Sequence, residues 1–244
     1  MSRRARIGFD RKLELEWLDL SAAKAAADAS TEEVKEYLLS SLDTLAYSGE
    51  ASGSARAKTV RVLLRVWGGV EPELKPLHDR ATALLPSIPP EQRIALHWAM
   101  MIAVYPFFAD HAAVFGRLLQ LQETVSAAQV KRRIAEQWGD RSTVMRTSRH
   151  VVRTMVAWGV IEDAGKGTYV RAGSPRPVAP EVAELLLEAV LLDSEQEALP
   201  LAKAFQHPAL FPFQLRPDIQ QLRKSDRIQI YRQGLDSDFV MLAG

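Results

Sequence analysis

The chain has 244 residues, of which 47% are hydrophobic and 25% are charged, and its formal net charge is only +1. This length and composition are sufficient for a sizeable buried core and for two or three small domains. The sequence contains no cysteine, which excludes disulfide bonds, cysteine nucleophiles and thiolate metal sites. The composition is therefore typical of a protein in a reducing, cytoplasmic compartment.

Neither a secretory signal nor a membrane span is expected. The basic start, Met1 to Arg6, leads directly into Ile7 to Lys12 without an apolar stretch. The longest stretch without formal charge runs from Ile94 to Ala109, which is shorter than the roughly 20 residues that a membrane helix needs. This stretch is predicted to be a buried core helix.

The first 109 residues are expected to form a multi-helix domain (1–109). Leu13 to Leu20 suggests an amphipathic helix, although its local alternation also allows a short strand. Ser30 and Glu33 have the spacing of a capping box and predict a helix start. Tyr47 to Ser54 is polar and glycine-rich, as an exposed loop is. Further helices are expected over 56–67, 73–85 and 90–104, and a helix over 111–124 is expected to begin the next unit.

Two helices joined by a tight turn are predicted next. Ser126 can cap the first, whose apolar residues recur at four-residue spacing up to Trp138 and which ends at Gly139-Asp140. Ser142 can cap the second. Its apolar positions are Val144, Val151, Val152, Met155 and Val156, whereas Arg146, Arg149 and Arg153 fall on another face. One face is therefore expected to pack and the other to form a basic stripe.

A β-hairpin is predicted directly after this helix. The segments 160–162 and 168–171 flank the turn Asp163-Ala-Gly-Lys-Gly167, whose two glycines permit positive φ. Lys166 is expected at the tip.

Basic residues are concentrated in this central region. From Ser126 to Arg176 there are ten lysines and arginines and four acidic residues, a net charge of +6, so the rest of the chain carries −5. Such a module is typical of a surface that binds phosphates. A solvated helix face or a protein-docking module would carry a similar stripe, and both alternatives stay open.

The remaining residues, 174–244, are expected to form a third unit. Ala172 to Pro180 is rich in proline and reads as a stiff connector. Helices are expected over 181–192, 195–205 and 218–224, and strands over 227–231 and 238–242 with a turn at 234–237. Because this order repeats that of the central region, a second, degenerate unit of the same plan is an alternative to an unrelated fold.

Catalytic chemistry has little support in the sequence. The loop around Gly49 and Gly53 has the residue types of a phosphate-binding loop, but four residues separate Gly53 from Lys58. The five histidines have no metal-ligand spacing, and His97 and His111 are expected to be hydrogen-bonded core residues. The protein is therefore expected not to be an enzyme and to use no metal or other cofactor.

Residues 126–171 resemble the winged helix-turn-helix superfamily. The resemblance implies a mainly α fold in which a winged helix-turn-helix (110–173) lies between the helical N-terminal domain and a C-terminal unit of helices plus a β-hairpin. By this resemblance Ser142, Thr143, Arg146 and Arg149 would approach bases, and Lys131, Arg132, Lys166 and Arg171 would approach phosphates. The complete set of expected DNA-binding residues also includes Arg141 and Arg153.

The whole layout also resembles, more weakly, the BrxA-type DNA-binding proteins of bacterial phage-exclusion islands. This resemblance implies a non-enzymatic protein that binds double-stranded DNA within an antiviral defence system. The N-terminal helical half would contact partner proteins or a second copy of the chain. A protein-docking scaffold subunit of a nucleic-acid-processing complex and a dimeric transcriptional repressor are the alternatives.

Overall fold

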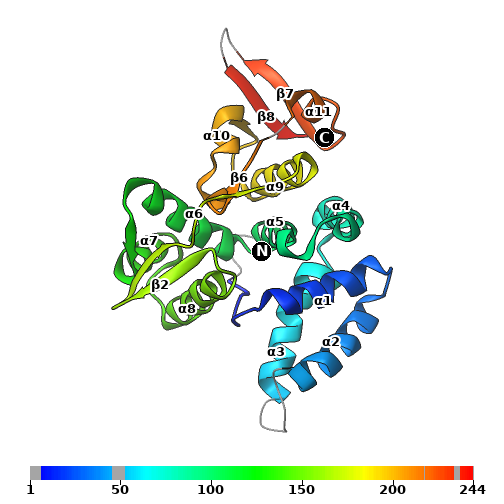
Figure 1. Cartoon of the computed structure of the whole chain (residues 1–244), viewed down its shortest axis with the longest axis vertical. Coiled ribbons are helices and arrows are strands. Elements are labelled where there is room, and N and C mark those ends of the chain that lie inside the picture. The colour runs from blue at the N-terminus through cyan, green and yellow to red at the C-terminus, as the bar shows by residue number, and fades with distance from the viewer. Residues whose placement is uncertain (1–6, 46–52, 217, 234–236, 244) are drawn as a thin grey trace.

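The protein is mainly helical, and small antiparallel sheets lie in its central and C-terminal parts (Figure 1). The computed structural model describes residues 7–45, 53–216, 218–233 and 237–243. The helices are α1 (Leu15–Ala26), α2 (Thr31–Leu45), α3 (Gly53–Leu63), α4 (Lys75–Leu84), α5 (Ile94–Val104), α6 (Pro106–Leu121), α7 (Ala127–Trp138), α8 (Ser142–Ala157), α9 (Pro180–Asp193), α10 (Leu201–Phe205) and α11 (Ile219–Leu222). A π-helical turn, Leu64–Gly68, extends α3, and short 3-10 turns occupy Pro72–Leu74, Leu85–Ser87, Pro90–Gln92 and Pro208–Leu210.

Helix α5 is the centre of the core, and its ten consecutive residues from Ile94 to Ala103 are buried, as the sequence predicts. The stretch 94–109 is not one helix, however, because α5 ends at Val104 and α6 begins at Pro106. It packs against α4, α6 and α9. The Trp98 indole contacts the rings of Phe108, Trp158 and Phe213 edge-on, and its Nε1 donates a hydrogen bond to a C-terminal backbone carbonyl at 2.8 Å. One tryptophan therefore joins elements from all three parts of the chain.

The expected domain boundary between residues 109 and 110 falls inside a continuous helix. Helix α6 begins at Pro106 and ends at Leu121, not at 111 and 124, because proline is well suited to the first position of a helix. The apolar core also continues without interruption from Phe9 to Phe213. The helical first half and the central region consequently share one core.

Among the described residues, no single helix is long and apolar enough to cross a membrane. The helical segments Pro90–Val104 and Pro106–Leu121 satisfy the length and composition criteria only as a pair, and the chain bends by 116° between them.

In the N-terminal part, the ambiguous stretch around Leu15 to Leu20 is helical and belongs to α1. The expected capping box at the start of α2 is confirmed, because the Ser30 amide donates to the Glu33 carboxylate at 2.7 Å and Ser30 Oγ accepts from the Glu33 amide at 3.3 Å. Most of the expected loop at 47–54 lies outside the described residues. Its last two residues, 53 and 54, begin α3.

The central region consists of α6, β1 (Thr124–Ser126), α7, α8, β2 (Ile161–Gly165) and β3 (Thr168–Arg171). The strands form an antiparallel sheet in the order β1-β3-β2, in which Val125 pairs with Tyr169 and Ile161 pairs with Arg171. Helices α6, α7 and α8 contact one another and the sheet.

The N-terminal segment before α1 lies against α8. The Leu13 amide donates to the Thr154 hydroxyl at 3.0 Å, and the Trp158 indole donates to the Leu13 carbonyl at 3.0 Å. Leu13 and Phe9 are both fully buried. Residues far apart in the sequence are thereby fixed beside the basic helix.

The C-terminal part differs from its expected form in two places. The connector 172–180 contains β4 (Arg176–Pro177), which pairs in parallel with β6 (Phe213–Gln214) and so is fixed to the core. The helix expected over 195–205 is wrong in its first half, where β5 (Ala198–Pro200) precedes the short α10. Pro200 explains the difference, because a residue that precedes proline disfavours helical backbone.

The strands β5, β7 (Ile228–Gln233) and β8 (Ser237–Leu242) form a second antiparallel sheet in the order β5-β8-β7. Two arginines, Arg80 on α4 and Arg227 next to β7, both bind Glu188 on α9 and so connect this sheet to the first half of the chain. Arg80 donates to Glu188 at 2.6 Å and to Glu184 at 2.8 Å, and Arg227 donates to Glu188 at 3.0 Å. Burial raises the pKa of Glu188, and the nearby Arg80 opposes this shift.

Candidate nucleic-acid interface

Helix α7 orients the first pair of expected site residues. Its predicted N-cap is confirmed, since Ser126 Oγ accepts from the Gln129 amide at 3.2 Å while the Ser126 amide donates to Gln129 Oε1 at 2.8 Å. Val130 and Ile134 are buried against the core. The opposite side of the helix, which carries Lys131 and Arg132, is exposed to solvent.

Helix α8 carries most of the expected site, but its start differs from the prediction. Arg141 occupies the N-cap position without a side-chain capping bond, and Ser142 is already inside the first turn. The Arg141 guanidinium instead donates to the Trp138 carbonyl at 3.3 Å, at the end of α7. Ser142 and Thr143 are exposed in the first turn of α8.

The two faces of α8 are separated as the spacing predicts. Val144, Val151, Val152 and Met155 are buried, and Val156 is half-buried. The basic stripe is exposed, and within the described part of the chain its members take part in no ion pair: these are Arg146, Arg149 and Arg153. Their charge is therefore available to a ligand.

The hairpin after α8 has a tight tip. Gly165, Lys166 and Gly167 have φ values of +85°, +52° and +71°, which glycine adopts readily and lysine rarely does. Asp163 Oδ1 accepts from the Gly165 amide at 2.9 Å at the bulge that precedes the tip. The Lys166 side chain is exposed there, as expected.

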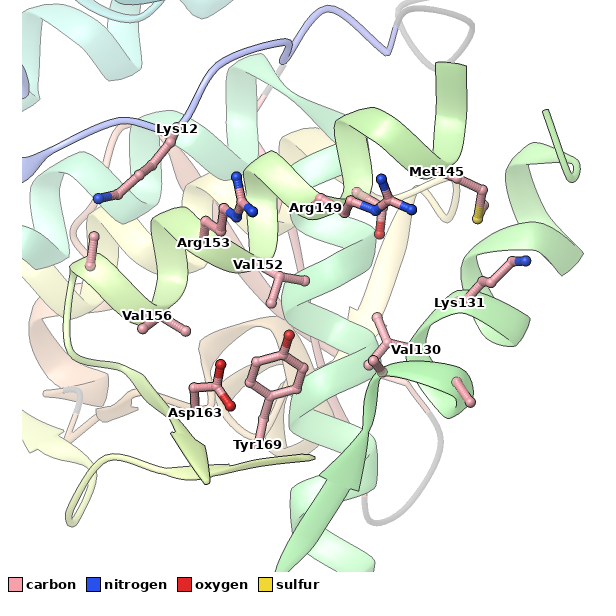
Figure 2. A pocket seen from close by; sticks show the side chains of 14 residues that line it. Lys12, Val130, Lys131, Met145, Arg149, Val152, Arg153, Val156, Asp163 and Tyr169 are labelled. Atoms are coloured by element: carbon pink, nitrogen blue, oxygen red, sulfur yellow. The ribbon is translucent and has the colours of Figure 1, made fainter. Parts of the chain in front are cut away.

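A groove of about 690 Å³ lies between α8, the start of α7 and the hairpin (Figure 2). Val130, Val152 and Tyr169 line its apolar part, and Tyr169 packs edge-on against Phe115 with ring centroids 5.8 Å apart. Burial raises the pKa of Tyr169. The cationic lining consists of Lys12, Lys131, Arg149 and Arg153, with Asp163 as the acidic member.

Lys12 and Tyr169 were not among the expected site residues. Lys12 reaches the groove only because the segment 9–13 is fixed beside α8, and no local sequence pattern encodes that contact. Tyr169 had a weak sequence signal. Side chains in a strand point alternately to its two faces, so an aromatic residue in a short hairpin strand next to a basic helix can face that helix.

Arg171 was expected to contact phosphate, and the structure places it elsewhere. Its guanidinium donates to the Phe211 carbonyl at 2.5 Å and lies 5.4 Å from the centroid of the Phe211 ring. Burial lowers the pKa of Arg171. These contacts occupy the side chain at the junction with the C-terminal part, so we no longer assign it to phosphate binding.

The histidines near the site are held within the fold. His111 is fully buried; one ring nitrogen lies 2.7 Å from the Phe107 carbonyl and the other lies 2.8 Å from Ser148 Oγ. Burial lowers its pKa to about 4. His150 on α8 does not line the groove, and its pKa is lowered by burial and then by Arg11 of the N-terminal segment.

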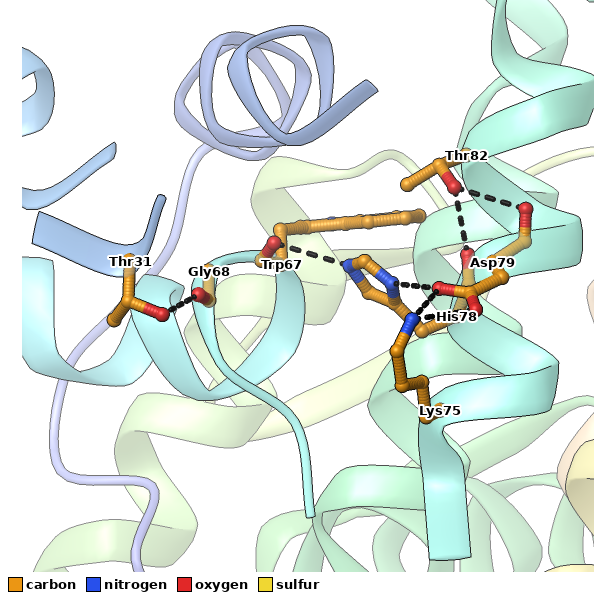
Figure 3. Close-up of polar contacts among 7 residues, drawn as sticks. All are labelled: Thr31, Trp67, Gly68, Lys75, His78, Asp79 and Thr82. Carbon is orange, nitrogen blue, oxygen red and sulfur yellow. Dashed lines mark hydrogen bonds and ion pairs between the residues drawn. The ribbon is translucent and has the colours of Figure 1, made fainter. Parts of the chain in front are cut away.

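A second polar cluster joins α4 to the end of α3 (Figure 3). His78 Nε2 lies 3.1 Å from the Trp67 carbonyl and Nδ1 lies 3.3 Å from Asp79, which also accepts from Lys75 at 2.6 Å. Both imidazole nitrogens thus lie near acceptors within the fold, and the cluster connects α4 with the turn that extends α3. Among the described residues, no group of three His, Asp or Glu side chains is placed to hold a metal ion.

Three of the expected cations, Lys131, Arg149 and Arg153, thus line the groove, whereas Arg171 does not. The others, Arg132, Arg141, Arg146 and Lys166, are exposed on α7, at the start and on the face of α8, and at the hairpin tip. Such a surface, with a projecting hairpin beside an exposed helix face, is suited to an extended polyanion. Comparison with known proteins identifies no relative, since no protein-family model, no curated protein and no solved structure matches the chain.

Proposed function

We propose that the protein is a non-enzymatic, double-stranded DNA-binding protein whose central region acts as a winged helix-turn-helix. The observation that carries this proposal is the exposed face of α8, on which Arg146, Arg149 and Arg153 lie without an ion-pair partner among the described residues. Neutralising DNA phosphates releases condensed counterions, so cations that are free before binding contribute directly to affinity.

The roles of the side chains follow from their positions on the three elements. The first turns of α8, with Ser142, Thr143, Arg146 and Arg149, would enter the major groove and contact base edges. Arg141 and Arg153 flank this set. Lys131 and Arg132 on α7 and Lys166 at the hairpin tip would contact phosphates on either side of it.

The proposal includes a biological setting. We place the protein in the cytoplasm, because it lacks cysteine, and in a bacterial antiviral defence system, because its layout resembles the BrxA-type proteins. The N-terminal helical half would serve as the contact surface for partner proteins or for a second copy of the chain.

Titration of the full chain onto a random 20-base-pair duplex at several salt concentrations tests the proposal, with a mass measurement of the free protein to define its oligomeric state. The three cations assigned to phosphates, Lys131, Arg132 and Lys166, predict a plot of log K against log salt with a slope of about −3. Absence of binding at low salt, or an affinity that does not depend on salt, would overturn the DNA-binding proposal. A symmetric dimer that protects a palindromic site would favour the repressor.

A further inference from the structure

The groove beside α8 has more apolar surface than contact with a DNA backbone requires. Phosphates are bound by cations and amides, whereas Val130, Val152, Val156 and Met145 contribute carbon surface to the groove. Its volume, about 690 Å³, falls within the roughly 300–1,000 Å³ that is typical of small-molecule sites. These dimensions suit a ligand with an apolar body.

Residues with polar side chains line the same groove. The Tyr169 hydroxyl points into the groove toward α8 (Figure 2), and no hydrogen-bond partner for it exists among the described residues. Lys131, Arg149 and Arg153 likewise have no ion-pair partner there, whereas Lys12 lies 2.6 Å from Glu14. Three unpaired cations and a free hydroxyl around an apolar floor favour an anionic ligand.

We propose that this groove binds a small aromatic anion of nucleotide size, independently of DNA. The aromatic ring lies over the floor formed by Val130, Val152 and Tyr169, where it removes apolar surface from water. The anionic group lies between Arg149 and Arg153, which can form charge-assisted hydrogen bonds to it. Asp163 accepts from an exocyclic donor of the ring system.

Binding would have a consequence for the proposed function. Arg149 and Arg153 belong both to the groove and to the face of α8 that we assign to DNA, so an anion bound there neutralises charge that DNA would use. The ligand therefore competes with duplex DNA. This consequence rests on the proposed function, whereas ligand binding itself does not.

Calorimetric titration of the full chain without DNA tests the site, with adenosine 5′-monophosphate as the probe and adenosine and inorganic phosphate as its separate halves. We expect the monophosphate to bind at least tenfold more tightly than either half. Absence of binding at millimolar concentration overturns the proposal. If phosphate binds as tightly as the monophosphate, the groove is only a cationic patch. If adenosine binds as tightly as the monophosphate, the arginines have no role in binding. Either result also overturns the proposal.

The location is tested by filling the groove without removing a charge. Ala128 lines the groove and is exposed, so Ala128→Trp should lower affinity for the monophosphate at least tenfold in a folded chain. Ala23→Trp, at an exposed site on α1, is the matched control and should bind normally. Unchanged binding by Ala128→Trp would place the ligand elsewhere. Duplex titrations with the same variants separate the two proposals, because each binding event has its own readout.

Discussion

Replacing Arg146 and Arg149 together with alanine should weaken DNA binding and leave the fold intact. Both side chains are exposed and neither has an ion-pair partner among the described residues, so the free energy of unfolding should change by about 0.5 kcal/mol or less per site. If both contact bases, the binding free energy should fall by about 2–6 kcal/mol in total.

The salt dependence of DNA binding gives a second, independent quantity to measure for the same variant. Seven exposed cations belong to the proposed interface: Lys131, Arg132, Arg141, Arg146, Arg149, Arg153 and Lys166. At about −0.9 for each phosphate contact, the three cations assigned to phosphates predict a slope of log K against log salt of about −3, which the double variant should keep if both arginines contact bases. If the two removed arginines contact phosphates instead of bases, the slope of the natural chain should be steeper by about 2, and the double variant should lose that difference.

Fluorescence anisotropy on one labelled duplex at four salt concentrations measures both quantities, and thermal unfolding confirms the fold. Arg133→Ala is the matched control, because Arg133 is exposed on α7, does not line the groove and lies 3.3 Å from Glu136. It should bind DNA almost normally. A folded double variant with unchanged affinity and slope would show that α8 does not contact DNA.

Four further predictions concern single positions. Lys166→Ala should reduce the salt slope by about one and leave sequence preference unchanged; a changed preference in a competition assay would mean that the tip contacts bases. Arg171→Ala should lower the midpoint of urea unfolding, because the Phe211 carbonyl loses its donor, while an altered salt slope with normal stability would return Arg171 to the DNA interface. Gly116→Ala would place Cβ 1.9 Å from the Pro208 carbonyl oxygen and should destabilise the fold by about 1–3 kcal/mol or more; an unchanged urea midpoint would contradict this packing. The pKa of His111 is lowered from 6.5 to about 4 by burial, so the unfolded state binds more protons between these values and stability should fall as pH falls through this window; a His111→Gln chain should lose part of that dependence, and identical pH profiles would contradict the assignment.

Local patterns predicted much of the central region. The caps at Ser30 and Ser126, the two faces of α8 and the hairpin around Lys166 each depend on residues within a few positions of one another. A short-range signal is sufficient in such cases, because hydrogen bonds within a turn and the helical repeat decide the conformation.

Long-range contacts account for part of what the sequence did not predict. Arg171 is occupied by Phe211, 40 residues away, and Lys12 is brought to the groove by contacts of its neighbour with residues more than 140 positions later. The boundary expected after residue 109 lies inside α6, because Pro106 begins that helix and the apolar core continues across it. Other differences are local: Pro200 disfavours helical backbone at the residue before it, and Arg141 takes the N-cap position of α8 expected for Ser142.

The attachment of Leu13 to α8 has a consequence for how the protein is made. Its partners, Thr154 and Trp158, are synthesised 141 and 145 residues later. At about 5–20 residues per second, a ribosome needs roughly 7–30 s to reach them. During that interval Leu13, which is fully buried in the finished protein, lacks these contacts with α8 and the residue that follows it. The nascent first half should therefore be a substrate for chaperones that bind exposed apolar segments until α8 emerges.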